Sequence, residues 1–357
     1  MDLITETART ASAELRARSA ELSEEIVARQ YAMQPELWKP YGERGRQISI
    51  RDMVYHIGYL ADSTLVQEPR LFTDYTGWLK VLFHHIGLPH QGLGATLECT
   101  REVISERLDR ELASVISPQL DAAIGYLPQA PETVESFIDE DLPYGDLAGR
   151  YISALLAGSQ SEASGLVEDE IAGGATVAEM YMHVFQPCQW EIGRLWQTAR
   201  ISVADEHYCT AATQMIMSRL YRYIFSGAKN GLAMVSTCVG DEMHELGARM
   251  VADLFEMNGW QTTYLGANVP TRDIIRTVEK QSVDVLAVSA TLISHIDEVS
   301  NLIAQARDCS RAGKLTILVG GYPFRVAAEL HTKVGADGSG LDARDAVETA
   351  RSIMQTC

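Results

Sequence analysis

The sequence has few cysteines, few basic residues and no long apolar run. Its six cysteines show no C-x-x-C spacing, and no apolar signal segment stands at the N-terminus. We therefore expect reduced thiols and a cytoplasmic protein. With 30 Lys and Arg against 48 Asp and Glu, the formal net charge is -18. This balance argues against a direct nucleic-acid surface, and the lack of a long apolar run argues against a membrane span.

The chain divides into three blocks, with no internal repeat. Residues 1–128 carry a helical pattern and end in a Pro-containing stretch, which predicts an all-α N-terminal domain. Residues 142–228 are also helical, and interruptions at Gly173-Gly174 and at 201–203 predict a four-helix bundle. Residues 229–357 alternate predicted strands and helices, which indicates a doubly wound, flavodoxin-like α/β domain with a parallel sheet.

His244 is the most informative residue. It follows the apolar run 232–236 and precedes a helical apolar pattern at 250–257, so we expect it on a strand-to-helix loop. Glu242 stands two residues before it and Gly247 three residues after it. An imidazole can bind a metal through one nitrogen while the other bonds a carboxylate, which orients the ring and raises its basicity. Taken alone, the short pattern is weak, and a helix-capping loop with a solvated histidine explains it better.

Small residues follow the later strands of the same block. Strands predicted at 285–289 and 315–319 end in Ser289 and in Gly320-Gly321. Ligands of doubly wound sheets bind at the carboxyl ends of the strands, and small residues there suit a long, narrow ligand tail. The residues expected in this site are Glu242, His244, Gly247, Ser289, Thr291, Gly320, Gly321 and Gly338.

This combination resembles the cobalamin-binding fold of methionine synthase and its relatives. The resemblance implies that the nucleotide tail of cobalamin is displaced and that His244 replaces it on cobalt. It also implies that Gly247 lets the helix start approach the corrin closely. That family usually has Asp where this chain has Glu242, which is a departure from the pattern.

The helical bundle contains a second motif, in which Trp196 is followed nine residues later by Glu206-His207. An ordinary core tryptophan and an exposed helix start would explain these residues in isolation. Before a cobalamin fold, however, Trp-x9-Glu-His resembles the light-sensing, adenosylcobalamin-dependent transcription repressors. The resemblance implies that the indole packs over the adenosyl group while the carboxylate and imidazole contact it. Those repressors have a histidine directly after the tryptophan, whereas this chain has Gln197, so His207, His183 or water is left for the upper cobalt site.

The N-terminal block is rich in rings, with four of the nine histidines between His56 and His90. Flat rings and imidazoles could line a tetrapyrrole pocket, with nearby Arg or Lys side chains pairing with propionates, and an aromatic-rich helical core explains them equally well. Because His84 and His85 are adjacent, at most one of them points inward. The candidates are Tyr55, His56, Tyr59, Trp78, His84 and His85, and Cys99 is either a thioether anchor or a plain buried thiol.

The whole arrangement resembles the photocobilins, which are light receptors that hold cobalamin and biliverdin. The resemblance implies a signalling protein, not an enzyme, whose ligands are the small-molecule chromophores adenosylcobalamin and biliverdin. Light would cleave the Co–C bond and change the domain arrangement or the state of a homo-oligomer, with no direct nucleic-acid or membrane partner. The alternative is a corrinoid methyl-carrier protein of a methyltransferase system. A mutase subunit needs a substrate barrel for which this chain has no room.

Overall fold

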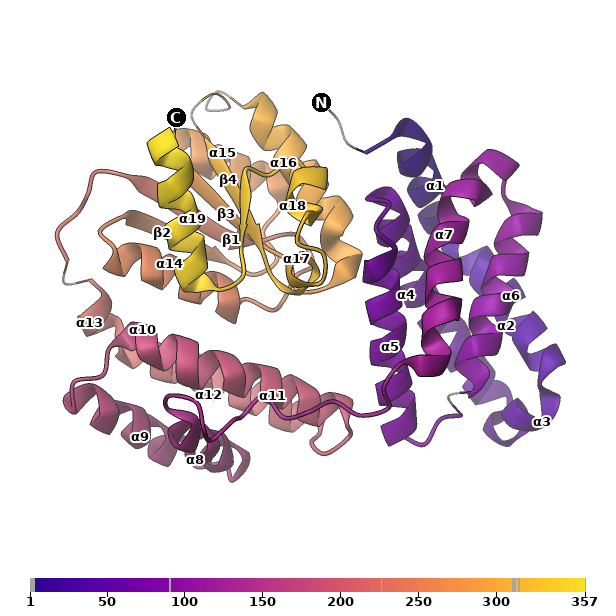
Figure 1. Cartoon of the computed structure of the whole chain (residues 1–357), viewed down its shortest axis with the longest axis horizontal. Helices are drawn as coiled ribbons and strands as arrows, with labels where there is room; N and C mark the ends of the chain where they lie inside the picture. Colours follow the sequence, from indigo (N-terminus) through magenta and orange to yellow (C-terminus); the bar gives the residue numbers. More distant parts are fainter. Residues whose placement is uncertain (1–3, 90, 226, 310–312, 314, 357) are drawn as a thin grey trace. The chain divides into compact units, whose positions relative to one another are not determined.

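The computed structural model describes residues 4–89, 91–225, 227–309, 313 and 315–356, so His90 and Cys357 lie outside the described residues. The chain forms two compact units (Figure 1). The first unit comprises Met1–Glu132, Ala290–Asp308 and Val319–Ser339, and the second comprises Thr133–Ser289, Cys309–Leu318 and Gly340–Cys357. Within the described ranges, no helix is both long enough and apolar enough to cross a membrane.

The N-terminal part of the first unit is entirely helical. Its helices are α1 (Glu6–Ala17), α2 (Ser19–Met33), α3 (Pro35–Trp38), η1 (Lys39–Tyr41), α4 (Gly42–Leu65), α5 (Pro69–His85), α6 (Gln91–Arg107), α7 (Arg110–Tyr126) and η2 (Leu127–Gln129). Helix α1 begins where the Thr5 hydroxyl accepts the Ala8 N–H, and α5 begins at Pro69, whose missing N–H costs nothing in a first turn. Buried Leu and Ile side chains at helical spacing hold these helices together.

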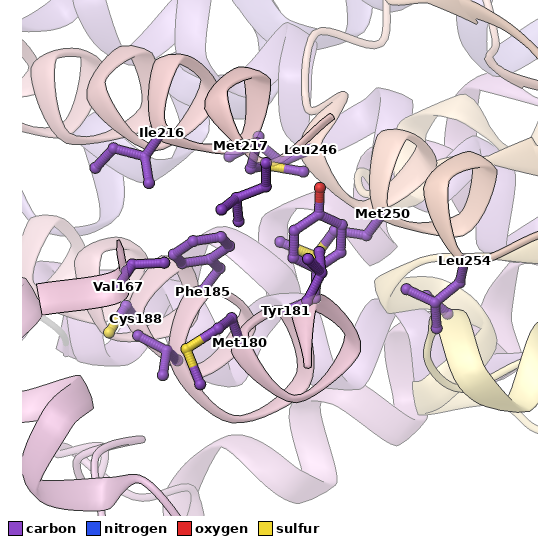
Figure 2. Close-up of a cluster of buried hydrophobic side chains, with 14 of the residues drawn as sticks. Val167, Met180, Tyr181, Phe185, Cys188, Ile216, Met217, Leu246, Met250 and Leu254 are labelled. Atoms are coloured by element: carbon purple, nitrogen blue, oxygen red, sulfur yellow. The ribbon is translucent and has the colours of Figure 1, made fainter. Parts of the chain in front are cut away.

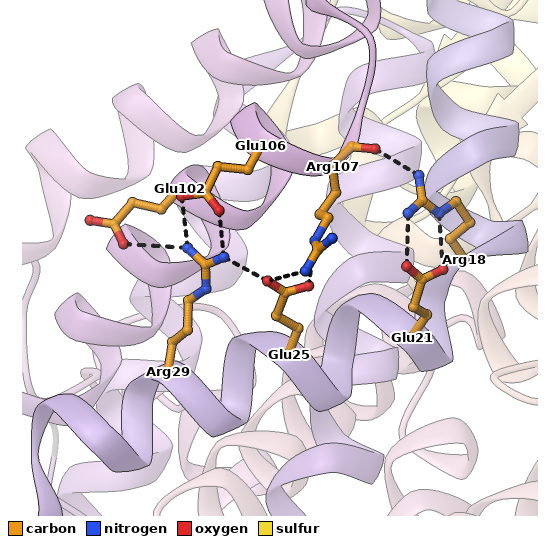
Figure 3. A network of polar contacts seen from close by, with 7 residues as sticks. All are labelled: Arg18, Glu21, Glu25, Arg29, Glu102, Glu106 and Arg107. Carbon is orange, nitrogen blue, oxygen red and sulfur yellow. Dashed lines mark hydrogen bonds and ion pairs between the residues drawn. The ribbon is translucent and has the colours of Figure 1, made fainter.

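A network of ion pairs joins α2 to α6 at the surface (Figure 3). Arg29 lies 2.6 Å from carboxylate oxygens of both Glu25 and Glu106, and Arg107 lies 2.7 Å from Glu25. Because solvent screens these exposed charges, each pair adds little to the stability of the fold. The network therefore links the two helices but adds little to the stability of the fold.

The same unit contains the segments that follow β3 and β4, namely η4 (Ile293–His295), α16 (Ile296–Asp308), α17 (Tyr322–Val326) and α18 (Leu330–Lys333). The fully buried carboxylate of Asp62 pairs with Arg16 and accepts the backbone N–H of Asp297 at 2.8 Å. The Tyr322 hydroxyl donates to Asp74 at 3.0 Å. Helices α4 and α5 thus contact the start of α16 and of α17.

The second unit begins with four helical rods. They are built from α8 (Gly145–Leu156), α9 (Gln160–Ala172), the continuous series α10 (Val177–Met180), η3 (Tyr181–Phe185) and α11 (Gln186–Gln197), and α12 (Val203–Arg219), followed by α13 (Tyr221–Ile224). The η3 segment is a π-helical turn, and it precedes Pro187, which has no N–H for the carbonyl one turn earlier. Capping boxes at Thr176–Glu179 and Ser202–Asp205 start α10 and α12.

The α/β part contains a five-stranded sheet in the order β2-β1-β3-β4-β5. The strands are β1 (Ala233–Cys238), β2 (Gln261–Gly266), β3 (Val285–Ser289), β4 (Thr316–Gly320) and β5 (Gly338–Gly340), with α14 (Leu246–Met257), α15 (Thr271–Gln281) and α19 (Ala343–Thr356) among the connecting helices. Strand β1 pairs in parallel with both β2 and β3. In this doubly wound order, β2 lies on one side of β1 and β3 on the other. Such sheets bind ligands between β1 and β3, where the strand order reverses. The predicted fold class is confirmed.

The bundle and the α/β part of the second unit share one apolar core (Figure 2). Phe185 and Met217 of the bundle belong to the same buried cluster as Met250 of α14. Within this core, the Tyr181 hydroxyl donates to Asp253 at 2.7 Å, and burial raises the pKa of Asp253 to about 6. The bundle is therefore anchored to α14 by packing and by a buried polar bond.

Replacing Tyr181 with Phe should weaken this anchor. The change leaves the buried Asp253 without its hydroxyl donor, and an unsatisfied buried group costs about 1–3 kcal/mol. Urea unfolding of Tyr181→Phe should show that loss of free energy, while the matched control Tyr208→Phe, which removes a half-exposed hydroxyl, should cost less. Equal stability of Tyr181→Phe and wild type would contradict a structural role for the bond.

Candidate functional site

His244 lies on the loop between β1 and α14 and is held by one carboxylate oxygen. Its Nδ1 lies 2.6 Å from Glu242 Oε1, and the same oxygen accepts the backbone N–H of His244 at 2.8 Å. The Glu242 side chain is fully buried, whereas 57% of the His244 side chain is exposed. The carboxylate thus fixes the ring from its protein side and leaves the opposite side accessible.

The bond to Glu242 also decides which nitrogen of His244 can bind a metal. An ionised carboxylate only accepts hydrogen bonds, so Nδ1 carries the proton and Nε2 keeps its lone pair. The bond to Glu242 raises the pKa of His244 against the opposing effect of burial, and the charges of Glu242 and Glu206 add to the rise. The longer carboxylate of this chain therefore still makes the bond that an Asp usually makes in the cobalamin fold.

The rest of the loop supports this arrangement. Asp241 has a left-handed backbone (φ 61°), and its N–H donates to the Asn268 side chain at 2.9 Å. A Cβ on Gly247 would meet no atom within 4 Å, so this side of the helix start faces open space. A large flat ligand could approach the backbone there.

The small residues at the strand ends lie in different local environments. Ser289 lies opposite Cys238 in the β1–β3 register, half-buried like Thr291 two residues later. Gly321 has φ 107°, and a Cβ there would collide with the carbonyl oxygen of Ala290. Backbone packing alone therefore requires glycine at 321. Gly320 ends β4, and the buried Gly338 begins β5 at the edge of the sheet.

The second motif lies at the junction of α11 and α12. Trp196 is half-buried near the end of α11, while Glu206 and His207 lie in the first turns of α12 and bond each other. Glu206 also accepts the Thr210 hydroxyl at 2.9 Å, and 75% of the His207 side chain is exposed. Helix α12, which begins with this turn, reaches the loop through Gln214, whose amide donates to Glu245.

The residue after Trp196 and the other histidine considered for the upper cobalt site lie in the same bundle. Gln197 is buried, and His183 lies in the π-helical turn with its ring 6.0 Å from that of Tyr144.

Three residues that the sequence did not single out complete the loop. The Gln214 amide of α12 donates to Glu245 Oε1 at 2.7 Å, and the Tyr264 hydroxyl of β2 donates to Glu245 Oε2 at 2.9 Å. Glu245 directly follows His244 and could have been suspected from that position. Nothing in the spacing of Gln214 or Tyr264 marks them.

In the N-terminal helices, the ring cluster centres on Tyr75, which the sequence did not single out. Its hydroxyl lies 2.6 Å from His56 Nδ1, and its ring stacks on Tyr59 with centroids 3.7 Å apart. The Trp78 ring lies 6.4 Å away and nearly parallel. Burial lowers the pKa of His56 to about 4. His56, Tyr59 and Trp78 thus all lie next to Tyr75.

Other candidates in these helices lie apart from the cluster. Tyr55 is 63% exposed. His84 and His85 end α5, where His84 Nδ1 lies 3.6 Å from Glu132 and His85 contacts the Val81 carbonyl. Cys99 is fully buried in α6.

Comparisons with known proteins identify the domains that the chain contains. Two family models, each described as a B12 binding domain, match residues 147–221 and 233–349. A dimethylamine corrinoid protein of Methanosarcina barkeri is 26% identical over 129 residues, 36% of this chain and 59% of the relative. The HTH-type transcriptional repressor CarH of Myxococcus xanthus is 25% identical over 163 residues, 44% of this chain and 52% of the repressor. The match thus covers 59% of the length of the corrinoid protein and 52% of the length of the repressor.

A solved structure supports the fold. The monomethylamine corrinoid protein of Methanosarcina barkeri aligns over its whole length with 60% of this chain, with a TM-score of 0.53 at 17% identity. The two domain matches establish a cobalamin-binding protein, whose B12-binding domain at residues 233–349 contains the parallel, five-stranded sheet.

The donor set suits cobalamin. Among the described residues, no group of three or more His, Cys, Asp and Glu side chains could hold a metal ion. His244 would hold the cobalt of a bound cobalamin through Nε2, because the bond of Nδ1 to Glu242 orients the ring and leaves the lone pair on Nε2.

Replacing His244 with Ala should remove that donor. We expect the affinity of the purified chain for hydroxocobalamin to fall more than about tenfold, and Glu242→Gln to lose about tenfold by weakening the orienting bond. Equilibrium dialysis measures both, with His331→Ala as the control because His331 is only partly buried and its ring contacts the carbonyl of Ala328, three residues away. Unchanged affinity in His244→Ala would exclude it as the cobalt ligand.

Proposed function

We propose that the protein is an adenosylcobalamin-dependent photoreceptor. In this proposal, His244 binds the lower face of the cofactor, and the turn carrying Trp196, Glu206 and His207 covers the upper face. What supports it is that the His244 loop and helix α12, which carries Glu206 and His207, lie in the same unit and are joined by the bond from the Gln214 amide of α12 to Glu245. Loss of the upper ligand would release the turn and change the domain arrangement or the state of a homo-oligomer, without a large displacement of the bundle from α14.

The side chains of the turn suit an adenosyl group. Bound adenosylcobalamin supplies a Co–C bond that visible light breaks. The Trp196 indole offers an apolar face for adenine, and the exposed imidazole of His207 can bond ribose hydroxyls. A methyl group offers neither a ring nor a hydroxyl, so these residues distinguish the two cofactors.

The second candidate function is a corrinoid methyl carrier, because one curated relative is named a dimethylamine corrinoid protein. A carrier must uncover the upper face of its corrin for each partner enzyme. In this chain the bundle shares its core with α14 and is anchored by the Tyr181–Asp253 bond. Large displacement of the bundle would expose that core, which favours the sensor over the carrier.

Affinities for two cobalamins test the proposal. Wild type should bind adenosylcobalamin more tightly than methylcobalamin, and Trp196→Ala should lose about tenfold for adenosylcobalamin alone, since stacking on an aromatic ring contributes about 1–3 kcal/mol. Green light should then bleach the adenosyl form and shift its elution in size-exclusion chromatography. Tighter binding of methylcobalamin by wild type, with no effect of Trp196→Ala, would support the carrier instead.

We extend the proposal to biliverdin in the N-terminal helices. The support is a polar pair, His56 and Tyr75, at a cavity lined from α4, α5 and α6 mainly by apolar side chains and three threonines. The cavity measures about 10 Å³, which is room for at most one water, whereas ligand pockets span about 300–1,000 Å³. Binding of a linear tetrapyrrole therefore requires these helices to separate.

Titration of biliverdin into the full chain should give a saturable, red-shifted band if this extension holds. His56→Leu removes the buried imidazole and should weaken binding about tenfold, while His84→Ala, outside the ring cluster, should leave it unchanged. Absence of a saturable band, or equal affinity of His56→Leu and wild type, would reduce this region to a helical interaction domain.

A further inference from the structure

Glu245 joins three elements at the His244 loop. It is the last loop residue before α14, and its Oε1 accepts the Gln214 amide of α12 at 2.7 Å. Its Oε2 accepts the Tyr264 hydroxyl at 2.9 Å and the Ala267 N–H at 3.1 Å. Both carboxylate oxygens are thus occupied, one by the bundle and the other by the end of β2.

The contacts on the two sides of this junction are of different kinds. On the sheet side, the Ala267 N–H is backbone, and a Cβ on the preceding Gly266 (φ 86°) would lie 3.2 Å from Glu245 Oε2. On the bundle side, one side-chain amide makes the contact. Arg249 of α14 also reaches α12, at the Gln214 carbonyl (3.3 Å) and at the Ser218 hydroxyl (2.9 Å). A shift of α12 therefore acts on Glu245 through Gln214.

We propose that Glu245 is a positioning residue that couples helix α12 to the cobalt ligand His244. The inference rests on the proposed function, because it uses the bundle as the cover of the upper face. Glu242 sets the tautomer and orientation of the imidazole, and Glu245 sets the position of the backbone that carries it. When the turn at Glu206 moves, α12 carries Gln214 with it, and the loop loses its tie to the bundle.

The test is hydrogen–deuterium exchange of the loop, residues 239–246, in the full chain. Gln214→Leu removes the amide that reaches Glu245, and Gln189→Leu is the matched control because the Gln189 amide bonds only Thr210 and Thr213 inside the bundle. With hydroxocobalamin bound, loop exchange should be at least about threefold faster in Gln214→Leu than in Gln189→Leu. Equal exchange in the two variants would overturn the coupling, whatever the upper ligand.

A second arm uses adenosylcobalamin. Green light should speed loop exchange in wild type and in Gln189→Leu, whereas in Gln214→Leu exchange should already be fast in the dark and change little. A light response in Gln214→Leu equal to that of wild type would overturn the inference. If wild type does not bind adenosylcobalamin or does not bleach, the photoreceptor proposal fails, and the hydroxocobalamin arm still decides the role of Glu245.

Discussion

The bond between Glu242 and His244 is the constraint on which the site depends. A carboxylate with no exposed surface is costly to bury unless donors satisfy it. Here the ring and the backbone N–H of the same histidine both donate to it, so the loop closes on itself. The residue that stabilises the buried charge is also the residue whose outer nitrogen, in our proposal, would bind cobalt. Loss of either partner disturbs both the loop and the ligand.

Strand β1 and helix α14 hold the two ends of this loop. Strand β1 lies at the point where the sheet order reverses, and its neighbours β2 and β3 pair with it in parallel. Helix α14 leaves the loop and packs with the bundle in one core, so the bundle and the loop share a rigid helix. Glu245 adds a polar tie at the beginning of that helix. The bundle is thus connected to the His244 loop through α14 and through Glu245.

Local spacing predicted what depends on neighbouring residues in the chain. The strand-loop-helix pattern located His244 and its carboxylate, and strand ends marked Ser289 and Gly321. The reason for Gly321 could not be seen, because its collision with Ala290 arises only when β3 and β4 lie side by side. Gln214 and Tyr264 meet Glu245 from elements 31 and 19 residues away, a distance at which sequence spacing says nothing.

The N-terminal helices show the same limit. A high density of rings predicted an aromatic cluster but not its members, since helix packing decides which faces point inward. His56 and Tyr59 meet Tyr75, while Tyr55, one residue before His56, points to solvent. Adjacent residues on a helix face different directions, so composition alone cannot assign them.

The central claim, that His244 binds cobalt through Nε2, is tested most directly by electron paramagnetic resonance of the chain loaded with cob(II)alamin. In protein labelled with ¹⁵N-histidine, the splitting of the cobalt lines by the axial nitrogen should change from a triplet to a doublet. A triplet that persists in the labelled protein would show that the nitrogen comes from the cofactor's own base. A spectrum without nitrogen splitting would show that no imidazole binds.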